Sequence, residues 1–154
     1  MFGEVDILVA CAGTGGTISG TGRYLKDVSD GAVQVIGADP EGSIYSNPDD
    51  VHQYKIEGVG EDFYPKAFDR GLPDEIVQVN DAEAFEMTRR LTKLPFLEGN
   101  SVINYGKLQT VVVLLPDSGR GYMEKIFDDD WMRANGFADI VERTTKPSLA
   151  EQYL

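Results

Sequence analysis

The first forty residues alternate short apolar runs with one longer stretch of helical spacing. Residues 5–10, VDILVA, form a run of the length and apolarity typical of a strand buried on both faces. Residues 18–28 place apolar side chains at helical spacing, and residues 33–38, VQVIGA, form a second apolar run. A glycine-rich segment, residues 13–17, joins the first run to the helix. The pattern predicts a strand–loop–helix–strand unit with a right-handed connection.

The remaining pattern predicts two further strands and two further helical stretches. We expect strands at residues 75–79 and 110–115; the second, TVVVLL, is the strongest strand pattern in the chain. Residues 82–92 are rich in helix formers and follow Asp81, a good N-cap, and residues 120–133 are expected to be mostly helical. Because strands and helices alternate, the predicted class is α/β.

The length of the chain indicates one domain. A chain of 154 residues can bury a stable core without disulfides or metal. We expect this domain to occupy residues 1–143 and residues 144–154, which are polar and contain proline, to form a tail or linker. Hydrophobic residues make up 42% and charged residues 26%, values typical of a soluble globular protein.

Charge and composition exclude several classes of function. A formal net charge of −12 argues against binding to nucleic acid and to anionic membranes, since both require a basic face. With one cysteine, Cys11, and one histidine, His52, the chain lacks an internal disulfide and the common metal clusters. No apolar stretch reaches the length of a membrane span and the start does not resemble a signal peptide, so a cytoplasmic location is expected.

Several side chains have simple structural interpretations. We expect His52 to be exposed in a polar loop and Cys11 to be a small buried residue rather than a nucleophile. Arg89 and Arg90 fit the polar face of a helix, and the aspartates at 128–130 are expected to be solvated and to cap a helix. Core packing is expected for four aromatic residues, Tyr54, Phe63, Tyr64 and Phe68.

The glycine-rich segment is the main candidate for chemistry. In Gly13-Thr14-Gly15-Gly16-Thr17 a strand ends, glycines turn the chain and a helix begins. Backbone N–H groups then converge in front of a helix N-terminus, where the helix dipole favours an anion, and threonine hydroxyls can add donors. Glycine leaves room for the close approach of a phosphate. A tight turn without a ligand is the simpler alternative.

Three ligand sites fit such a loop to different degrees. A P-loop is rejected because Thr21 stands where its lysine is required. A dinucleotide loop fits Gly13 and Gly15 but has Ile18 in place of the third glycine; Asp39, at the end of the next strand, could hold a ribose. The third site is a cradle for the single phosphate of pyridoxal phosphate. Asp39 and its neighbour Glu41 are otherwise expected to be structural or to line a cleft.

Four motifs carry a resemblance to a known family. GTGGTISG, IGADPEGS, EGVGEDF and VVVLLPDSGRGYMEKIFDDDWM occur in this order between about residues 5 and 137. They resemble the C-terminal half of the catalytic domain in the cystathionine β-synthase and cysteine synthase family. The resemblance implies an incomplete three-layer αβα domain of fold type II with pyridoxal 5'-phosphate as cofactor. It assigns the cofactor phosphate to Gly13, Thr14, Gly15, Gly16 and Thr17.

The resemblance also implies an activity and a substrate class. It implies a β-replacement lyase that condenses serine with homocysteine to cystathionine in transsulfuration and cysteine biosynthesis, with cysteine synthase as an alternative. Residues 57–60 would border the active site. The partners would be a small amino-acid substrate and a second subunit, either in a homodimer or as a full-length relative.

Two departures from the family pattern affect the expected activity. The family's Schiff-base lysine precedes the glycine loop, and none of the lysines in this chain occupies that context. The family's GGSxG turn, whose serine contacts the pyridine nitrogen, reads LEGNSV at residues 97–102, and a following helix is missing or replaced; neither Asn100 nor Ser101 is assigned the serine's role. We therefore expect no catalytic residue in this chain and no activity alone. A non-catalytic interaction module and a nucleotide-binding domain remain alternatives.

Overall fold

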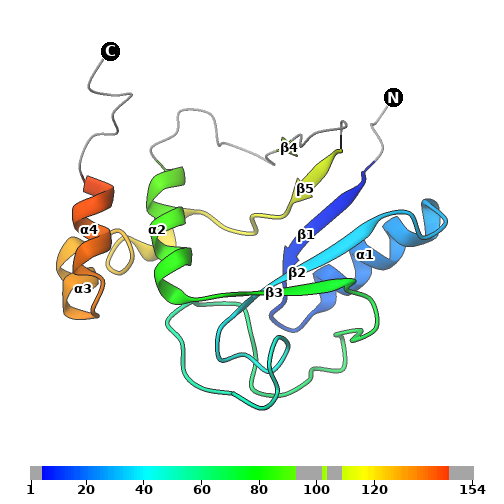
Figure 1. Ribbon diagram of the computed structural model, residues 1–154, viewed down its shortest axis with the longest axis horizontal. Helices are drawn as coiled ribbons and strands as arrows, with labels where there is room; N and C mark the ends of the chain where they lie inside the picture. Colours follow the sequence, from blue (N-terminus) through cyan, green and yellow to red (C-terminus); the bar gives the residue numbers. More distant parts are fainter. Residues whose placement is uncertain (1–4, 93–101, 104–108, 146–154) are drawn as a thin grey trace. The chain divides into compact units, whose positions relative to one another are not determined.

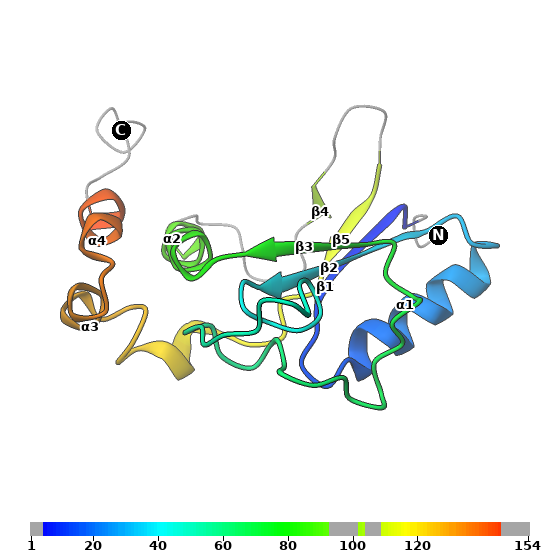
Figure 2. The same cartoon turned by 60° about the horizontal axis from the view of Figure 1, so that its bottom comes forward.

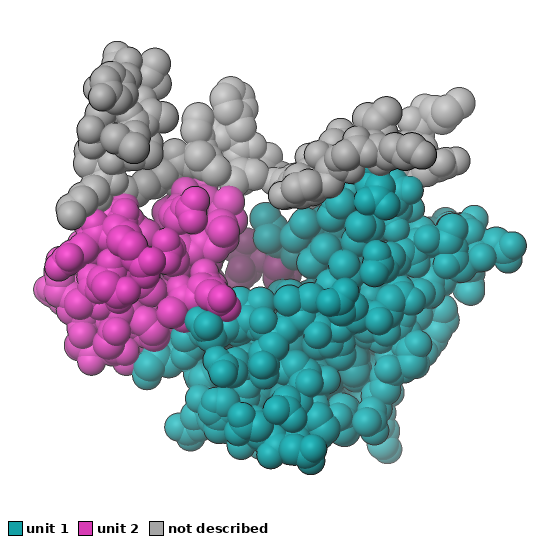
Figure 3. Space-filling view, in the orientation of Figure 1, with its two compact units in different colours: residues 1–81, 98–115 teal, residues 82–97, 116–154 magenta. Residues whose placement is uncertain are grey.

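The computed structural model describes residues 5–92, 102–103 and 109–145. The chain divides into two compact units, coloured separately in Figure 3. Unit 1 comprises Met1–Asp81 and Glu98–Leu115, and unit 2 comprises Ala82–Leu97 and Pro116–Leu154. Each unit is described by itself.

Unit 1 is built on a five-stranded sheet with the strand order β3-β2-β1-β5-β4. Strands β1, β2, β3 and β5 run parallel, and β4 is antiparallel to β5 (Figure 1). Parallel neighbours require crossover connections, and the one between β1 and β2 is helix α1. The bounds are β1 Ile7–Cys11, β2 Gln34–Pro40, β3 Glu75–Val79, β4 Val102–Ile103, β5 Val111–Val113 and α1 Gly16–Val28.

Helix α1 lies along one face of the sheet, beside β1 and β2 (Figures 1 and 2). Its buried Ile18 joins Leu8 of β1 and Val35 of β2 in the core of the unit. A Cβ at Gly22 would lie 3.2 Å from Cγ2 of Val35, so glycine permits the close approach of helix and sheet there. The α/β class is confirmed, with α1 as the helical layer on this face.

Unit 2 is helical in its described residues. It contains α2 Asp81–Leu91, which begins at the last residue of unit 1, a 3₁₀ helix Gly119–Tyr122, α3 Asp129–Ala134 and α4 Ala138–Thr145. The ring of Phe85 on α2 packs edge-on against Trp131 and Phe137, with ring centroids 6.1 and 5.1 Å apart. Aromatic edge contacts of this kind add to the gain from burying the rings.

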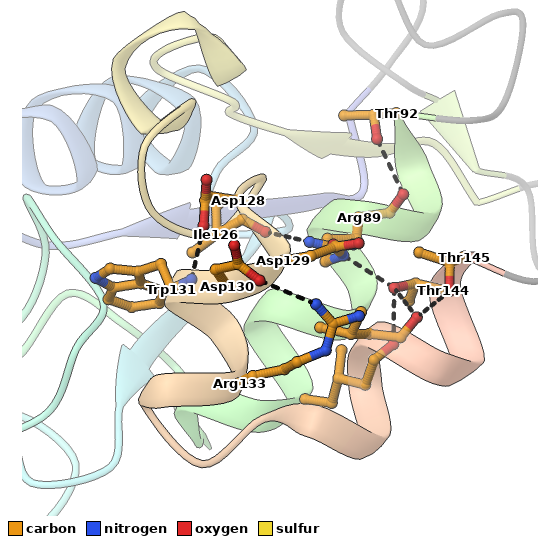
Figure 4. Close-up of polar contacts among 12 residues, drawn as sticks. Arg89, Thr92, Ile126, Asp128, Asp129, Asp130, Trp131, Arg133, Thr144 and Thr145 are labelled. Atoms are coloured by element: carbon orange, nitrogen blue, oxygen red, sulfur yellow. Dashed lines mark hydrogen bonds and ion pairs between the residues drawn. The ribbon is translucent and has the colours of Figure 1, made fainter.

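Arg89 connects several elements of unit 2 through its buried side chain. The prediction that it lies on the polar face of a helix was therefore wrong. Its side chain donates to Oγ1 of Thr144 at 2.9 Å, to the carbonyl of Ile126 at 2.9 Å and to the carboxylate of Asp129 at 2.5 Å (Figure 4). Arg89 is buried, whereas the adjacent Arg90 is exposed as expected. Three donors on one planar guanidinium reach partners on three separate segments.

Most of the expected elements occur in the structure, but residues 81 and 120–133 differ from the expectation. The 75–79 strand has the expected bounds, but residues 120–133 form only a 3₁₀ turn and a short α3 rather than one long helix. Asp81, expected as an N-cap, is the first residue of α2, and its carboxylate accepts the amides of Lys55 and Ile56. Asp128 does cap α3, since its side chain accepts the amide of Trp131 at 2.6 Å.

The end of the described chain is more ordered than the sequence pattern indicates. Thr144 and Thr145 belong to α4, so these two residues of the expected tail are helical, and Thr144 is buried. The other residues of that tail, and the 97–101 segment with Asn100 and Ser101, lie outside the described residues. Within the described ranges no helix has the length and apolarity to cross a membrane.

Candidate functional site

The segment between β1 and α1 leaves several backbone donors unpaired. The first turn of α1 has no acidic residue, and its N-cap, Gly15, makes no side-chain capping bond. No acceptor in the described part of the chain takes the amide hydrogens of Gly16 or Thr17. Both residues are exposed. Free amides at the positive end of a helix, without a competing carboxylate, form a site suited to an anion.

Glycine is required at position 15 for two independent reasons. Gly15 has a φ of 80°, a left-handed conformation that side chains disfavour. A Cβ there would also lie 2.5 Å from Cβ of Phe68. At Gly16, in contrast, an added Cβ would meet nothing within 4 Å. The loop is therefore packed tightly on its inner side and open on its outer side, as the approach of a phosphate requires.

Two hydrogen bonds hold the carbonyl groups of the loop from within the unit. The amide of Gly60 donates to the carbonyl of Ala12 at 2.7 Å, and the hydroxyl of Tyr45 donates to the carbonyl of Gly13 at 2.5 Å. A Cβ on Gly13 would lie 3.0 Å from the carbonyl oxygen of Gly58. Residues 57–60, expected to border the site, thus lie directly against the glycine loop.

Asp39 is buried, and its carboxylate is engaged within unit 1. Its Oδ2 accepts the amide of Ser46 at 2.9 Å, while Oδ1 is buried without a hydrogen-bond partner. Burial raises the pKa of the Asp39 carboxyl, and hydrogen bonds from Ser46 and Ser43 partly offset this. Asp39 therefore has the structural role that was expected as the alternative to holding a ribose. This carboxylate does not present itself to a ribose as a dinucleotide site requires.

Most of the other residues with sequence-based expectations lie as expected, but Phe63, expected to pack in the core, is 57% exposed. His52 and Glu41 are exposed, as expected for His52. Cys11 is half-buried at the end of β1, and burial, with the charge of Asp39, raises the pKa of its thiol, which disfavours the nucleophilic thiolate. Among the described residues, no group of histidine, cysteine and acidic side chains could hold a metal ion.

Two aromatic residues contact the loop, and the sequence pattern assigned neither of them to the site. Phe68 was expected only to pack in the core, and Tyr45 carried no expectation. Their rings lie 4.3 Å apart between centroids, and both contact the glycine loop. The hydroxyl of Ser19 on α1 accepts the amide of Asp69 at 2.9 Å, which fixes the segment carrying Phe68. No local signal marks Tyr45, because its partner Gly13 lies 32 positions away.

Residues 1–114 match the family described as pyridoxal-phosphate dependent enzyme. The chain is 39% identical to cystathionine β-synthase of Dictyostelium discoideum over 98% of its own length and 33% of the relative. It is 41% identical to that of Oryctolagus cuniculus over 94% of its own length and 29% of the relative. The chain thus spans about a third of these relatives.

Solved structures give the same result for the fold. An O-acetylserine-dependent cystathionine β-synthase from Helicobacter pylori matches with a TM-score of 0.67 and 30% identity, over 79% of this chain and 43% of that one. A hydrogen sulfide-producing enzyme from Fusobacterium nucleatum matches with a TM-score of 0.65 and 30% identity, over 77% and 44%. The chain belongs to the pyridoxal-phosphate-dependent enzyme family, within which it is similar to part of cystathionine β-synthase.

Proposed function

We propose that residues 13–17 bind the phosphate of pyridoxal 5'-phosphate and that the chain forms the phosphate-binding part of a β-replacement lyase. The observation that carries this proposal is the set of unpaired, exposed amides at the start of α1, with no acidic residue in the first turn. The family match covers this segment. A phosphate monoester is the part of the cofactor that such donors recognise.

The donors of the loop are of the kind that a phosphate group requires. The amides of Gly16 and Thr17 would donate to the phosphate oxygens, and the exposed hydroxyls of Thr14 and Thr17 would supply further donors. The cofactor, when bound, supplies the electron sink for chemistry on an amino acid. This chain's contribution would be to hold and orient the phosphate and, through residues 57–60, to wall one side of the site.

The proposed substrates are small amino acids with a leaving group on the β-carbon. Similarity to cystathionine β-synthases supports the condensation of serine with homocysteine to cystathionine. One of the two solved relatives is an O-acetylserine-dependent enzyme and the other produces hydrogen sulfide, which keeps a cysteine synthase reaction as a second candidate. A complete site would need the family's Schiff-base lysine and a subunit partner. We propose that the partner is a second copy or a full-length relative, and that the lysine comes from the full-length relative.

Binding of a nucleotide through the same loop is the weaker candidate. A dinucleotide site needs an acid that is free to accept the ribose hydroxyls. Asp39, the residue at the corresponding strand end, is 3% exposed and has one oxygen engaged by Ser46. The loop therefore offers a place for one phosphate group without the ribose contact.

The proposal is tested by a matched pair of substitutions on α1. Gly16 and Gly20 are both exposed, and a Cβ at either would meet nothing within 4 Å, so both sites accept a side chain. Gly16→Asp places a negative charge in the first turn, whereas Gly20→Asp places it one turn later. Calorimetric titration with pyridoxal phosphate should show a roughly hundredfold loss of affinity for Gly16→Asp, about 2.7 kcal/mol, and a small change for Gly20→Asp.

Unphosphorylated pyridoxal, inorganic phosphate, NAD and ATP separate the candidates. We expect phosphate to compete with pyridoxal phosphate, and we expect pyridoxal alone not to bind. Tighter binding of NAD or ATP than of pyridoxal phosphate would support the nucleotide site instead. Equal affinity of the wild type and Gly16→Asp for pyridoxal phosphate would reject the loop as the phosphate site.

A further inference from the structure

We propose that Tyr45 is a positioning residue for the glycine loop and that Asp39 fixes the segment that carries it. The consequence for the cofactor rests on the proposed phosphate site. The effect on the loop itself does not, and it is measured separately below.

Tyr45 contacts the loop directly and from the interior. The residue is 7% exposed, and its hydroxyl donates to the carbonyl of Gly13 at 2.5 Å. Its ring packs on Phe68, and Phe68 in turn fills the space beside Gly15. The two rings therefore contact the loop at Gly13 and at Gly15, on either side of Thr14.

The hydrogen bond to Gly13 also determines where an amide points. A peptide unit is planar and trans, so the carbonyl of Gly13 and the N–H of Thr14 point in opposite directions. With the carbonyl held inward by Tyr45, the Thr14 amide is directed outward. Thr14 is exposed, and no acceptor within the described ranges takes its amide hydrogen. Tyr45 would thus act on a phosphate through the Thr14 amide, without touching the phosphate.

Asp39 holds the segment that positions the Tyr45 ring. Residues 41–46 follow directly from β2, and Oδ2 of Asp39 accepts the amide of Ser46, the residue after Tyr45. Within the same segment, the fully buried hydroxyl of Ser43 accepts the amide of Tyr45 at 3.4 Å and that of Glu61 at 3.2 Å. The tyrosine is therefore anchored on both sides along the chain.

Asp39 also lines a small cavity together with the same aromatic residues. Oδ1 is buried without a partner, and the small cavity beside Asp39 is lined by Ala12, Tyr45 and Phe68, among others. An unpartnered buried acceptor costs stability. An asparagine would keep an acceptor for the Ser46 amide, so the anchoring depends on that acceptor rather than on charge. Asp39→Asn should leave the glycine loop as ordered as in the wild type, and Asp39→Ala should make it mobile.

Tyr45→Phe tests the proposal, with Tyr64→Phe as its matched control. Tyr64 lies in the same aromatic cluster, with its ring 6.0 Å from that of Tyr45, and its hydroxyl also donates to a backbone carbonyl, that of Ile44 at 3.0 Å. Each change removes one hydroxyl and leaves the ring. Only Tyr45→Phe releases the glycine loop, so a general loss of stability would appear in both variants.

Two measurements on the purified chain are needed. Backbone ¹⁵N relaxation should show the order parameters of residues 13–16 falling from about 0.85 to below about 0.6 in Tyr45→Phe and staying unchanged in Tyr64→Phe. Titration should show that Tyr45→Phe binds pyridoxal phosphate about tenfold more weakly, as the loss of one oriented donor predicts. Asp39→Ala should reproduce both changes, and Asp39→Asn neither.

The outcomes separate this inference from the proposed function. Unchanged order parameters in Tyr45→Phe would overturn the positioning role, whatever the ligand affinities. A mobile loop together with unchanged affinity for pyridoxal phosphate would also overturn it, because the orientation of Thr14 would then not matter to the phosphate. If the wild type does not bind pyridoxal phosphate but the loop of Tyr45→Phe is mobile, the proposed function fails and the control of the loop by Tyr45 stands.

Discussion

Phe68 occupies the space that any side chain at Gly15 would need. A Cβ built on Gly15 lies 2.5 Å from Cβ, 2.6 Å from Cδ2 and 2.7 Å from Cα of Phe68. One of these atoms belongs to the backbone, so rotation of the Phe68 ring alone cannot relieve the overlap. The tight side of the glycine loop is therefore set by a residue 53 positions later in the chain, and the loop's open side faces the amides of α1.

We expect Gly15→Ala to destabilise unit 1 through strain and overlap together. A left-handed alanine costs about 1 kcal/mol and overpacking about 1–3 kcal/mol, so the loss should be about 2–4 kcal/mol. Gly31→Ala is the control, because Gly31 has a φ of 82° but no neighbour within 4 Å of an added Cβ. It should lose only about 1 kcal/mol.

Both glycine variants can be measured by hydrogen exchange at the amide of Val35. This residue is fully buried in β2, and its exchange reports the unfolding of unit 1. Similar losses for Gly15→Ala and Gly31→Ala would mean that Phe68 moves aside without cost.

The buried carboxyl of Asp39 should make unit 1 less stable as pH rises. Burial raises the pKa of Asp39 above the ordinary value of 3.8, so the folded state keeps the proton to a higher pH than the unfolded state does. The contribution of Asp39 to stability is then fully present below pH 3.8 and is lost as pH rises through the folded-state pKa. Asp39→Asn lacks this proton equilibrium.

The difference in unfolding free energy between Asp39→Asn and the wild type should therefore increase from pH 4 toward pH 7 in favour of asparagine. Urea unfolding at a series of pH values measures it, and the other titrating groups cancel because both proteins contain them. If the wild type instead becomes more stable relative to Asp39→Asn as pH rises, hydrogen bonds from Ser46 and Ser43 lower the pKa of Asp39 by more than burial raises it.

Arg89 should be needed for the stability of unit 2. Arg89→Met removes the donors to Thr144, Ile126 and Asp129, and leaves a buried carbonyl and a carboxylate without their cation. The expected loss is about 3 kcal/mol. Arg90→Met on the same helix is exposed and should change stability by less than about 0.5 kcal/mol.

The single tryptophan provides the measurement for this pair. Trp131 belongs to unit 2 and packs against Phe85, so its fluorescence during urea unfolding follows this unit. Equal midpoints for Arg89→Met and Arg90→Met would show that the helices hold together without the buried guanidinium.

Reduction with borohydride after addition of pyridoxal phosphate should label no single lysine stoichiometrically. Lys26 of α1 lies in the last turn of the helix, about 15 Å along the axis from Gly16 at 1.5 Å per residue. Its ammonium is engaged with Asp74 at 2.7 Å. Peptide mass spectrometry measures the labelling, with the urea-unfolded chain as the reference. One dominant modified lysine in the folded chain would identify an unexpected covalent site.

Local sequence was enough to place the glycine loop and most strands. The apolar run before Gly13 and the helical spacing after it indicate a strand, a turn and a helix N-terminus, because each signal depends on neighbouring residues. The prediction of one helix over residues 120–133 was wrong because it, too, rested only on neighbouring residues. Its composition favours a helix, but the chain forms a 3₁₀ turn and a separate α3 started by Asp128.

The sequence by itself determined the class of the fold and the β1–loop–α1 unit, and it predicts an anion site at the loop. Only the tertiary structure decided which residues hold that loop, since Tyr45 meets Gly13 across 32 positions. It likewise placed Arg89 inside unit 2, where its partner Thr144 lies 55 positions away. Backbone propensity acts between neighbours along the chain, whereas these contacts exist only after distant segments pack, so no local pattern contains them.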